Sequence, residues 1–362
     1  MMIDSKTVLG VPPFPIKEWA ELPQDIIEFI SKKLTLYSDY LRFRCVCRTW
    51  NSYVPKTPLH LPPQFPWLML SHTTFFDPST HKFHHLNLPL SSSHNTLICG
   101  SSFGWLIILH EISEVRLLNP ITHVTLSLPS LYTLPEFVRK PLESNNNNFL
   151  YKVVLSSSPS LSHDFAAFSI LNFSQLAFCK KSCDSWCLFS VNENHVWTDV
   201  VSKNGLFYVV STKGMIAVCD VEGPRVSIIE TTNSGNLLKD IYCVMFSGEV
   251  MLLVSRSFPE IDVSHTKMFR VLKMNWNMLN WEEIHTLGEN MLFVGLRSCV
   301  SFSAADFAGC RPNLIYFTND FFGRDDFGIY SLSDESVELL ASYPINSDGR
   351  LRFPVWVTPN PR

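Results

Sequence analysis

The sequence predicts two domains of different fold class, a small all-α unit near the N-terminus and a larger all-β domain of the propeller type. An apolar stripe with helical spacing lies between Trp19 and Asn51. Farther along, a strand–turn–strand unit recurs after 42 residues, and no long helical stripe follows it. With 362 residues, of which 46% are hydrophobic and 13% aromatic, the chain is long enough for both domains.

Charge and hydropathy argue against several classes of protein. The net charge is −4 and no basic patch with interleaved aromatic residues occurs, so we expect no nucleic-acid partner. No apolar run is long enough to span a bilayer, so no membrane association is expected. Residues 1–17 lack the features of a signal peptide and are predicted to form a flexible lead. The ten cysteines follow no disulfide framework, which indicates reduced thiols in a protein of the nucleus, the cytoplasm or both.

The N-terminal stretch predicts two helices and a short third one. Pro23 suits the first helical position, because its missing N–H costs nothing there. The apolar stripe of this helix consists of Ile26, Ile27, Ile30 and Leu34. Ser38 or Asp39 can cap a second helix, and Val46 and Trp50 anchor the end of the unit. An amphipathic stripe alone is equally compatible with a subdomain that packs only against its own chain.

The all-β domain is indicated by a repeated turn motif. Asp77-Pro-Ser-Thr80 and Asn119-Pro-Ile-Thr122 each precede a strand that ends in Leu-x-Leu-Pro. The Asp or Asn side chain caps such a turn, and Pro sets φ at its first central position. The spacing of 42 residues between the two motifs is the length of one propeller blade. A β-sandwich is the alternative, but it would not explain this repeat.

Alternating strands continue to the end of the chain. We count six units, or seven if residues 156–200 contain an irregular blade. The late strand Arg352–Thr358 is expected to complete the blade that begins near Trp67, which closes the ring. The units are expected to begin at or include the strands at 67–70, 105–109, 151–155, 207–210, 251–254 and 314–317.

The helical stretch resembles an F-box, the module that docks a protein onto a Skp–cullin ubiquitin ligase. Leu22-Pro23-x-Asp25-Ile26-Ile27 is similar to the F-box opening, and Val46-Cys47-Arg48-x-Trp50 is similar to its close. The resemblance implies an F-box over residues 18–56 whose apolar residues bind a Skp-type adaptor. The implied adaptor-binding residues are Leu22, Pro23, Ile26, Ile27, Ile30 and Leu34, with Val46 and Trp50 as anchors of the unit.

The rest of the chain resembles the plant domain of unknown function 295, the propeller of KIB-type F-box proteins. The similar motifs are Gly104-Trp105-Leu106, Trp197-x-Asp199, Gly309-Cys310-Arg311-x-Asn313 and Pro354-x-Trp356, in the order of that family. The resemblance implies a linker over 57–66 and a propeller over 67–362. The polar segment at 137–149 departs from the family and is predicted to be a mobile loop.

Candidate chemistry is sparse. Cys179, Cys183 and Cys187 are four residues apart, but no second pair of ligands follows, so we expect no metal site. No motif for a nucleophile, a nucleotide-binding loop or a metalloprotease is present, so we expect no catalytic residues and no cofactor.

The sequence therefore predicts a non-catalytic substrate-recognition subunit of a ligase, which reaches a cullin through its adaptor and binds an unknown protein substrate with its propeller. The alternatives are a scaffold or competitor that acts without a cullin, and a propeller enzyme.

Overall fold

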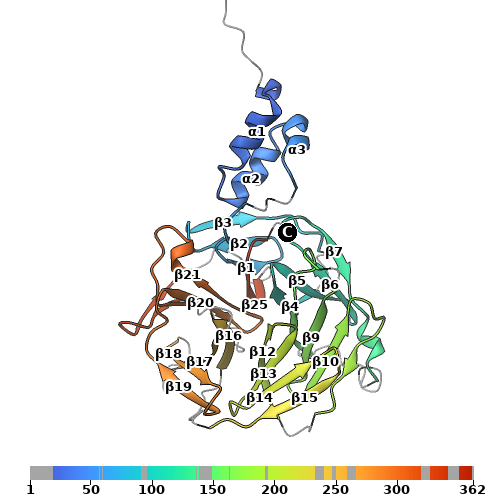
Figure 1. Cartoon of the computed structure of the whole chain (residues 1–362), viewed down its shortest axis with the longest axis vertical. Helices are drawn as coiled ribbons and strands as arrows, with labels where there is room; N and C mark the ends of the chain where they lie inside the picture. Colours follow the sequence, from blue (N-terminus) through green and yellow to red (C-terminus); the bar gives the residue numbers. More distant parts are fainter. Residues whose placement is uncertain are drawn as a thin grey trace, which may run out of the picture. The chain divides into compact units, whose positions relative to one another are not determined.

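The computed structural model describes residues 19–360, apart from 57, 59, 91–95, 136, 138–148, 163, 192–194, 233–239, 247–249, 259–265, 319–326 and 341–349. The chain divides into two compact units between Pro62 and Pro63, inside the segment predicted as a linker. The first unit is helical and the second contains the strands (Figure 1).

The helical unit contains a 3₁₀ helix at Trp19–Glu21, then α1 (Gln24–Ser31), α2 (Tyr37–Arg44) and α3 (Arg48–Tyr53). Pro23 is extended, with φ −56° and ψ 146°, so it precedes α1 rather than occupying its first position. The expected cap at Ser38 or Asp39 is wrong, because α2 already begins at Tyr37. Asp39 instead lies in the first turn, where a carboxylate favours the helix dipole. Cys47 caps α3 by accepting a hydrogen bond from the Trp50 amide at 3.5 Å.

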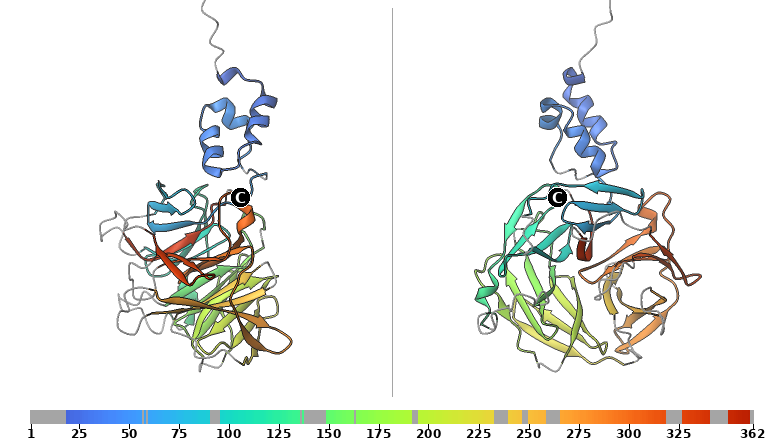
Figure 2. Two further views of the ribbon diagram at one scale, coloured as in Figure 1. Left: turned by 90° about the vertical axis from the view of Figure 1, so that its left-hand side faces the viewer. Right: turned by 180° about the vertical axis from the view of Figure 1, so that it is seen from behind.

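The second unit is a propeller of six sheets, as the sequence predicts (Figure 2). From the innermost strand outward, the first sheet contains β25 (Arg350–Val357), β1 (Trp67–Ser71), β2 (Thr74–Asp77) and β3 (Lys82–His85). The second contains β4 (Thr96–Ser102), β5 (Trp105–His110), β6 (Glu114–Leu118) and β7 (Thr125–Ser127). The third contains β8 (Leu150–Leu155), β9 (Ala166–Leu171), β10 (Gln175–Lys180) and β11 (Cys187–Leu188).

The fourth sheet contains β12 (Trp197–Lys203), β13 (Leu206–Ser211), β14 (Ile216–Asp220) and β15 (Arg225–Ile229). The fifth contains β16 (Asp240–Phe246), β17 (Val250–Ser257), β18 (Met268–Asn275) and β19 (Asn280–Ile284). The sixth contains β21 (Ser298–Ser303), β20 (Asn290–Gly295), β22 (Leu314–Phe317), β23 (Gly328–Ser331) and β24 (Ser336–Leu339). Short 3₁₀ helices lie at Leu131–Thr133 and Ala304–Asp306.

The ring closes by pairing its last strand with its first. β25 lies antiparallel to β1, with Leu68 opposite Trp356 and Trp67 opposite Val357. The prediction that the late strand completes the first blade is therefore confirmed. The alternative of a seventh blade within residues 156–200 is wrong, because the strands there belong to the third sheet and the start of the fourth.

The sixth sheet differs from the other five by an additional strand. β20 runs parallel to β22, with Met291 opposite Leu314, and β21 folds back antiparallel on the inner side of β20. In this position β21 lies next to β4, β16 and β25, the innermost strands of three other sheets. The sequence-based count assigned no role to β21.

Six apolar clusters hold the ring together, one between each pair of neighbouring sheets. Trp105 and Leu155 belong to the cluster between the second and third sheets. Trp281 belongs to the cluster between the fourth and fifth sheets, and Trp356 to that between the sixth and the first. β8 is buried along its whole length, whereas the outer strand β15 is largely exposed. Burial of each large apolar side chain contributes about 1.5–3 kcal/mol.

The repeated turns form as the sequence predicts. Asp77 accepts hydrogen bonds from the Ser79 amide at 2.9 Å and the Thr80 hydroxyl at 2.9 Å. Asn119 Oδ1 accepts from the amides of Ile121 at 3.0 Å and Thr122 at 3.1 Å. These short polar side chains satisfy amides that no strand pairs.

The loop predicted at 137–149 lies mostly outside the described residues. Its two ends, Phe137 and Phe149, are described, and their rings lie 5.0 Å apart in the cluster between the second and third sheets.

Candidate functional site

The helical unit has a small interior built around Trp50. Its indole N–H donates to the backbone oxygen of Trp19 at 3.0 Å, and its ring lies 4.4 Å from that of Phe43. Tyr40 is buried and donates to the backbone oxygen of Pro55 at 2.7 Å. These contacts connect the 3₁₀ helix, α2, α3 and the segment that follows α3. α1 packs against α3, so its outer side chains stand on this scaffold.

The residues predicted to bind an adaptor separate into three groups by their burial. Ile27 is fully buried, so the expectation that it contacts an adaptor is not supported by its placement, and we assign it to the interior. Trp50 is also buried, in keeping with its expected role as an anchor. Pro23, Ile26 and Val46 are exposed, whereas Leu22, Ile30 and Leu34 are half-buried.

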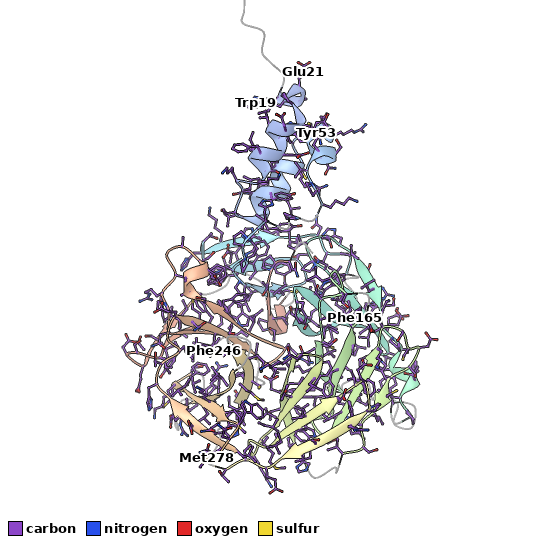
Figure 3. All side chains as sticks on the ribbon, viewed as in Figure 1. Trp19, Glu21, Tyr53, Phe165, Phe246 and Met278 are labelled. Carbon is purple, nitrogen blue, oxygen red and sulfur yellow. The ribbon has the colours of Figure 1, made fainter. Side chains whose placement is uncertain are left out.

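Several exposed apolar side chains were absent from the sequence-based set. Trp19 is 71% exposed and Phe29 is 60% exposed, and Leu36 is also exposed. Figure 3 shows Trp19 at the start of the helical unit. Phe29 lies three residues after Ile26 in α1, so the two side chains are neighbours on one helix face. The stripe drawn from isoleucine and leucine spacing missed Phe29, although a large aromatic residue three positions from Ile26 is the signal that could have found it.

We call Trp19, Ile26, Phe29, Leu36 and Val46 the apolar set; they are the large hydrophobic residues that the described part of the helical unit exposes. Exposed apolar side chains that stand together, as Ile26 and Phe29 do on α1, mark surfaces that bind a partner, because each costs free energy in water. The Lys33 ammonium lies 5.2 Å from the centre of the Phe29 ring, which places a positive charge at the edge of this surface.

The propeller offers a different kind of site, a buried cluster of charged and thiol groups on the innermost strands. Lys152 on β8 forms an ion pair with Asp199 on β12, and both side chains are buried. Asp199 also accepts hydrogen bonds from the Cys243 amide at 2.7 Å and the Cys299 thiol at 3.5 Å. We call Lys152, Asp199, Cys243 and Cys299 the axial cluster, because β8, β12, β16 and β21 contribute one residue each.

The protonation states of the axial cluster do not suit catalysis. Burial would lower the pKa of Lys152, but the Asp199 carboxylate together with the nearby Cys299 and Cys243 outweighs this effect, so the pKa is raised and the side chain is an ammonium. Burial raises the pKa of Cys299 to about 12, although Lys152 opposes the shift. A buried ammonium and a protonated thiol are poor nucleophiles. The cluster therefore acts as a connection between strands.

The cysteines singled out in the sequence do not converge on a metal. Cys179 is buried in the cluster between the second and third sheets, whereas Cys183 and Cys187 are exposed. Throughout the residues that the structure describes, no group of three or more His, Cys, Asp or Glu side chains is arranged to hold a metal ion.

Among the described helices, none has the length and the apolar character that a membrane span requires.

Comparison with known proteins identifies both units. Residues 19–61 match the F-box domain, and residues 75–331 match the KIB1-4 β-propeller. The chain is 24% identical to the putative F-box protein At3g25750 of Arabidopsis thaliana over 355 residues, covering 88% of this chain and 93% of that protein. It is 25% identical to the F-box protein SKIP23 of the same plant, covering 95% of this chain and 97% of that protein.

Proposed function

Because this chain belongs to the F-box proteins with a KIB1-4 β-propeller, we propose that it is the substrate-recognition subunit of a Skp–cullin–F-box ubiquitin ligase. An F-box implies binding to a Skp-type adaptor, and this architecture is typical of adaptor or receptor proteins rather than enzymes. Under the proposal, the helical unit docks on the adaptor and the propeller binds the protein to be ubiquitinated. The complex acts in the nucleus, the cytoplasm or both.

The observation that carries the proposal is the apolar set on the helical unit. Ile26 and Phe29 stand side by side on α1, and both are exposed. An amphipathic helix that presents such residues binds by laying this face into an apolar groove of its partner. A unit that only packed against its own chain would bury them, as it does Ile27 and Trp50.

The proposed division of labour leaves the chemistry to other subunits. Lys152, Asp199 and Cys243 of the axial cluster are buried, Cys299 is partly buried, and the lysine and both thiols are protonated, which supports a role without catalysis. The chain would act by holding substrate and ubiquitin-loaded enzyme in one assembly, which raises the effective concentration of the reacting groups.

The test is adaptor binding by the full-length protein carrying Ile26→Asp and Phe29→Asp. Two carboxylates on this face cannot enter an apolar groove without losing hydration, so we expect affinity for a Skp-type adaptor to fall by about a hundredfold or more. The matched control is Leu161→Asp with Met278→Asp, which places the same charges on exposed apolar residues of the propeller and should leave adaptor affinity unchanged. Unchanged adaptor binding by the helical variant would overturn the proposal.

A second measurement separates a ligase subunit from a scaffold. The wild-type protein, the adaptor and a cullin are mixed and resolved by size-exclusion chromatography. A single complex containing all three supports the ligase. A complex with the adaptor that excludes the cullin would overturn the ligase assignment and indicate a scaffold or competitor.

A further inference from the structure

Two exposed cysteines share one hairpin of the third sheet, and neither takes part in the proposed function. β10 ends at Lys180 and β11 begins at Cys187, so residues 181–186 connect the two strands. Cys183 lies within this connection and Cys187 directly follows it, and both are exposed free thiols. Their separation of four residues is short enough for a single loop to bring them together.

The third cysteine of the motif, Cys179, lies on the opposite face of the sheet from Cys187. Cys187 lies opposite Phe178 in the β10–β11 ladder, so both side chains are on the same face of the sheet. Cys179 is the next residue along β10 and therefore points to the other face, into the cluster with the second sheet. Burial raises the pKa of Cys179, and the nearby Cys183 and Cys187 add to the shift. Cys179 is thus an inert core thiol, and the exposed chemistry belongs to the other two.

The hairpin loop is held at both ends, which limits the positions available to the two thiols. The Cys183 amide donates to the backbone oxygen of Lys180 at 3.0 Å, so the chain turns back at Cys183. Trp186, next to Cys187, donates its amide to Thr133 Oγ1 at 3.0 Å and its indole N–H to the backbone oxygen of Pro129 at 2.8 Å. A turn before one cysteine and an anchor beside the other keep the thiols within one small surface region.

We propose that Cys183 and Cys187 are a thiol–disulfide switch that closes by exchange with a low-molecular-weight disulfide such as glutathione disulfide. In the first step, one thiolate attacks a sulfur of glutathione disulfide, forms a mixed disulfide and releases one glutathione thiolate. In the second step, the other protein thiolate attacks the protein-bound sulfur of the mixed disulfide and releases a second glutathione thiolate. The two protons of the protein thiols end on the two glutathione molecules.

The chemistry favours closure over a stable mixed disulfide. The second step is intramolecular, so the resolving thiol has a high effective concentration at the mixed disulfide. A protein disulfide requires the two Cα atoms to approach within about 7 Å. A turning loop of this length reaches that distance with local movement, since neither thiol is packed in a core. The closed ring would contain residues 183–187 and would stiffen the loop between β10 and β11, which contacts Thr133 through Trp186.

The test uses the full-length protein incubated with glutathione disulfide, alkylated in the folded state and digested with trypsin. Trypsin cleaves after Lys181 and Lys203, so Cys183 and Cys187 fall in one peptide and Cys179 in another. We expect the peptide 182–203 to carry no alkyl label. Its mass should be lower by two hydrogen atoms than that of the same peptide with two free thiols. A peptide that keeps both labels, or that accumulates glutathione on either cysteine, would overturn the proposal.

Two single variants and one control sharpen the result. In Cys183→Ser and Cys187→Ser no resolving thiol remains, so the other cysteine should accumulate a glutathione adduct. Both residues are exposed, so neither substitution disturbs the core. Cys45→Ser removes an exposed cysteine of the helical unit and should leave closure of the 182–203 peptide unchanged. Loss of closure in the Cys45 variant would show that the disulfide is not local to the hairpin and would contradict the proposal.

Discussion

The helical unit and the propeller depart from the usual distribution of side chains in opposite directions. α1 exposes apolar Phe29, whereas the propeller buries Lys152 and Asp199 between its innermost strands. An exposed aromatic residue has an unfavourable interaction with water that a partner surface can relieve. A buried charge has lost its hydration, and only a partner within the same fold can compensate it. The exposed Phe29 therefore predicts binding to a partner. The buried Lys152–Asp199 pair predicts that the fold loses stability when one charge is left without the other.

The comparison is tested most strongly by removing one member of the buried ion pair. Asp199→Ala leaves the Lys152 ammonium buried without its counter-charge, so the free energy of unfolding should fall by about 3–5 kcal/mol. Urea denaturation followed by tryptophan fluorescence measures the change. The double variant Lys152→Met with Asp199→Leu removes both charges and should recover much of the loss. A single variant as stable as the wild type would show that the pair does not hold the inner strands.

Ile27 and Phe29 allow a comparison between a buried and an exposed side chain within α1. Ile27→Ala should destabilise the helical unit by about 2–4 kcal/mol, because it opens a cavity where the side chain is fully buried. Phe29→Ala should leave stability nearly unchanged and instead weaken adaptor binding by about 1–2 kcal/mol, roughly tenfold. Amide hydrogen exchange reports the stability of the helical unit, and titration calorimetry reports adaptor affinity. Equal effects of the two variants on stability would remove the distinction between interior and binding face.

The sequence predicts the structural features of the propeller that follow from local patterns. The 42-residue repeat of Asp77 and Asn119 led to the propeller, and the pairing of β1 with β25 was expected because a ring must close. β21 was not predicted, because its position depends on which strands already surround it and not on its own alternation. In the same way, Lys152 lies in an ordinary strand pattern, and its burial follows only from β8 being innermost.

The exposed set was predicted in part for a similar reason. Ile26 was found because it fits a known motif, whereas Ile27 fits the same motif but faces inward. Val46 was expected to be an anchor of the unit and is exposed instead. Helical spacing places residues around an axis but does not say which side the rest of the unit covers. Trp19 lies outside the helix and Phe29 lies off the aliphatic stripe, so neither was assigned to the surface.

The close packing of uncharged groups on the innermost strands gives a prediction of intermediate size. A Cβ atom on Gly100 of β4 would lie 2.5 Å from the backbone oxygen of Val153 on β8. Gly100→Ala should therefore push these two strands apart and cost about 1–3 kcal/mol of unfolding free energy. Gly223→Ala is the matched control, since its nearest neighbours lie 3.9 Å away and its backbone is not in the left-handed region. Thermal unfolding of both variants compares them, and a Gly100 variant as stable as the Gly223 variant would argue against close packing of the inner strands.

An exposed ion pair completes the comparison with the buried one. Arg270 on β18 donates to both carboxylate oxygens of Glu283 on β19, at 2.9 and 2.8 Å, and these hydrogen bonds lower the pKa of Glu283 below its ordinary value of 4.5. About a third of each side chain remains exposed, so solvent screening limits the contribution to about 0.3–1 kcal/mol. Because the folded-state pKa is depressed, this stabilisation is complete above pH 4.5 and is lost as the pH falls through the lowered value.

The measurement is the difference in urea midpoint between the wild type and Glu283→Gln at neutral pH and at about pH 3. We expect a small difference at neutral pH that shrinks as the carboxyl is protonated. A difference as large as that of Asp199→Ala would mean that exposure does not separate the two ion pairs. A small difference would place the stabilising charge of this propeller on the inner strands, where water cannot replace a lost partner.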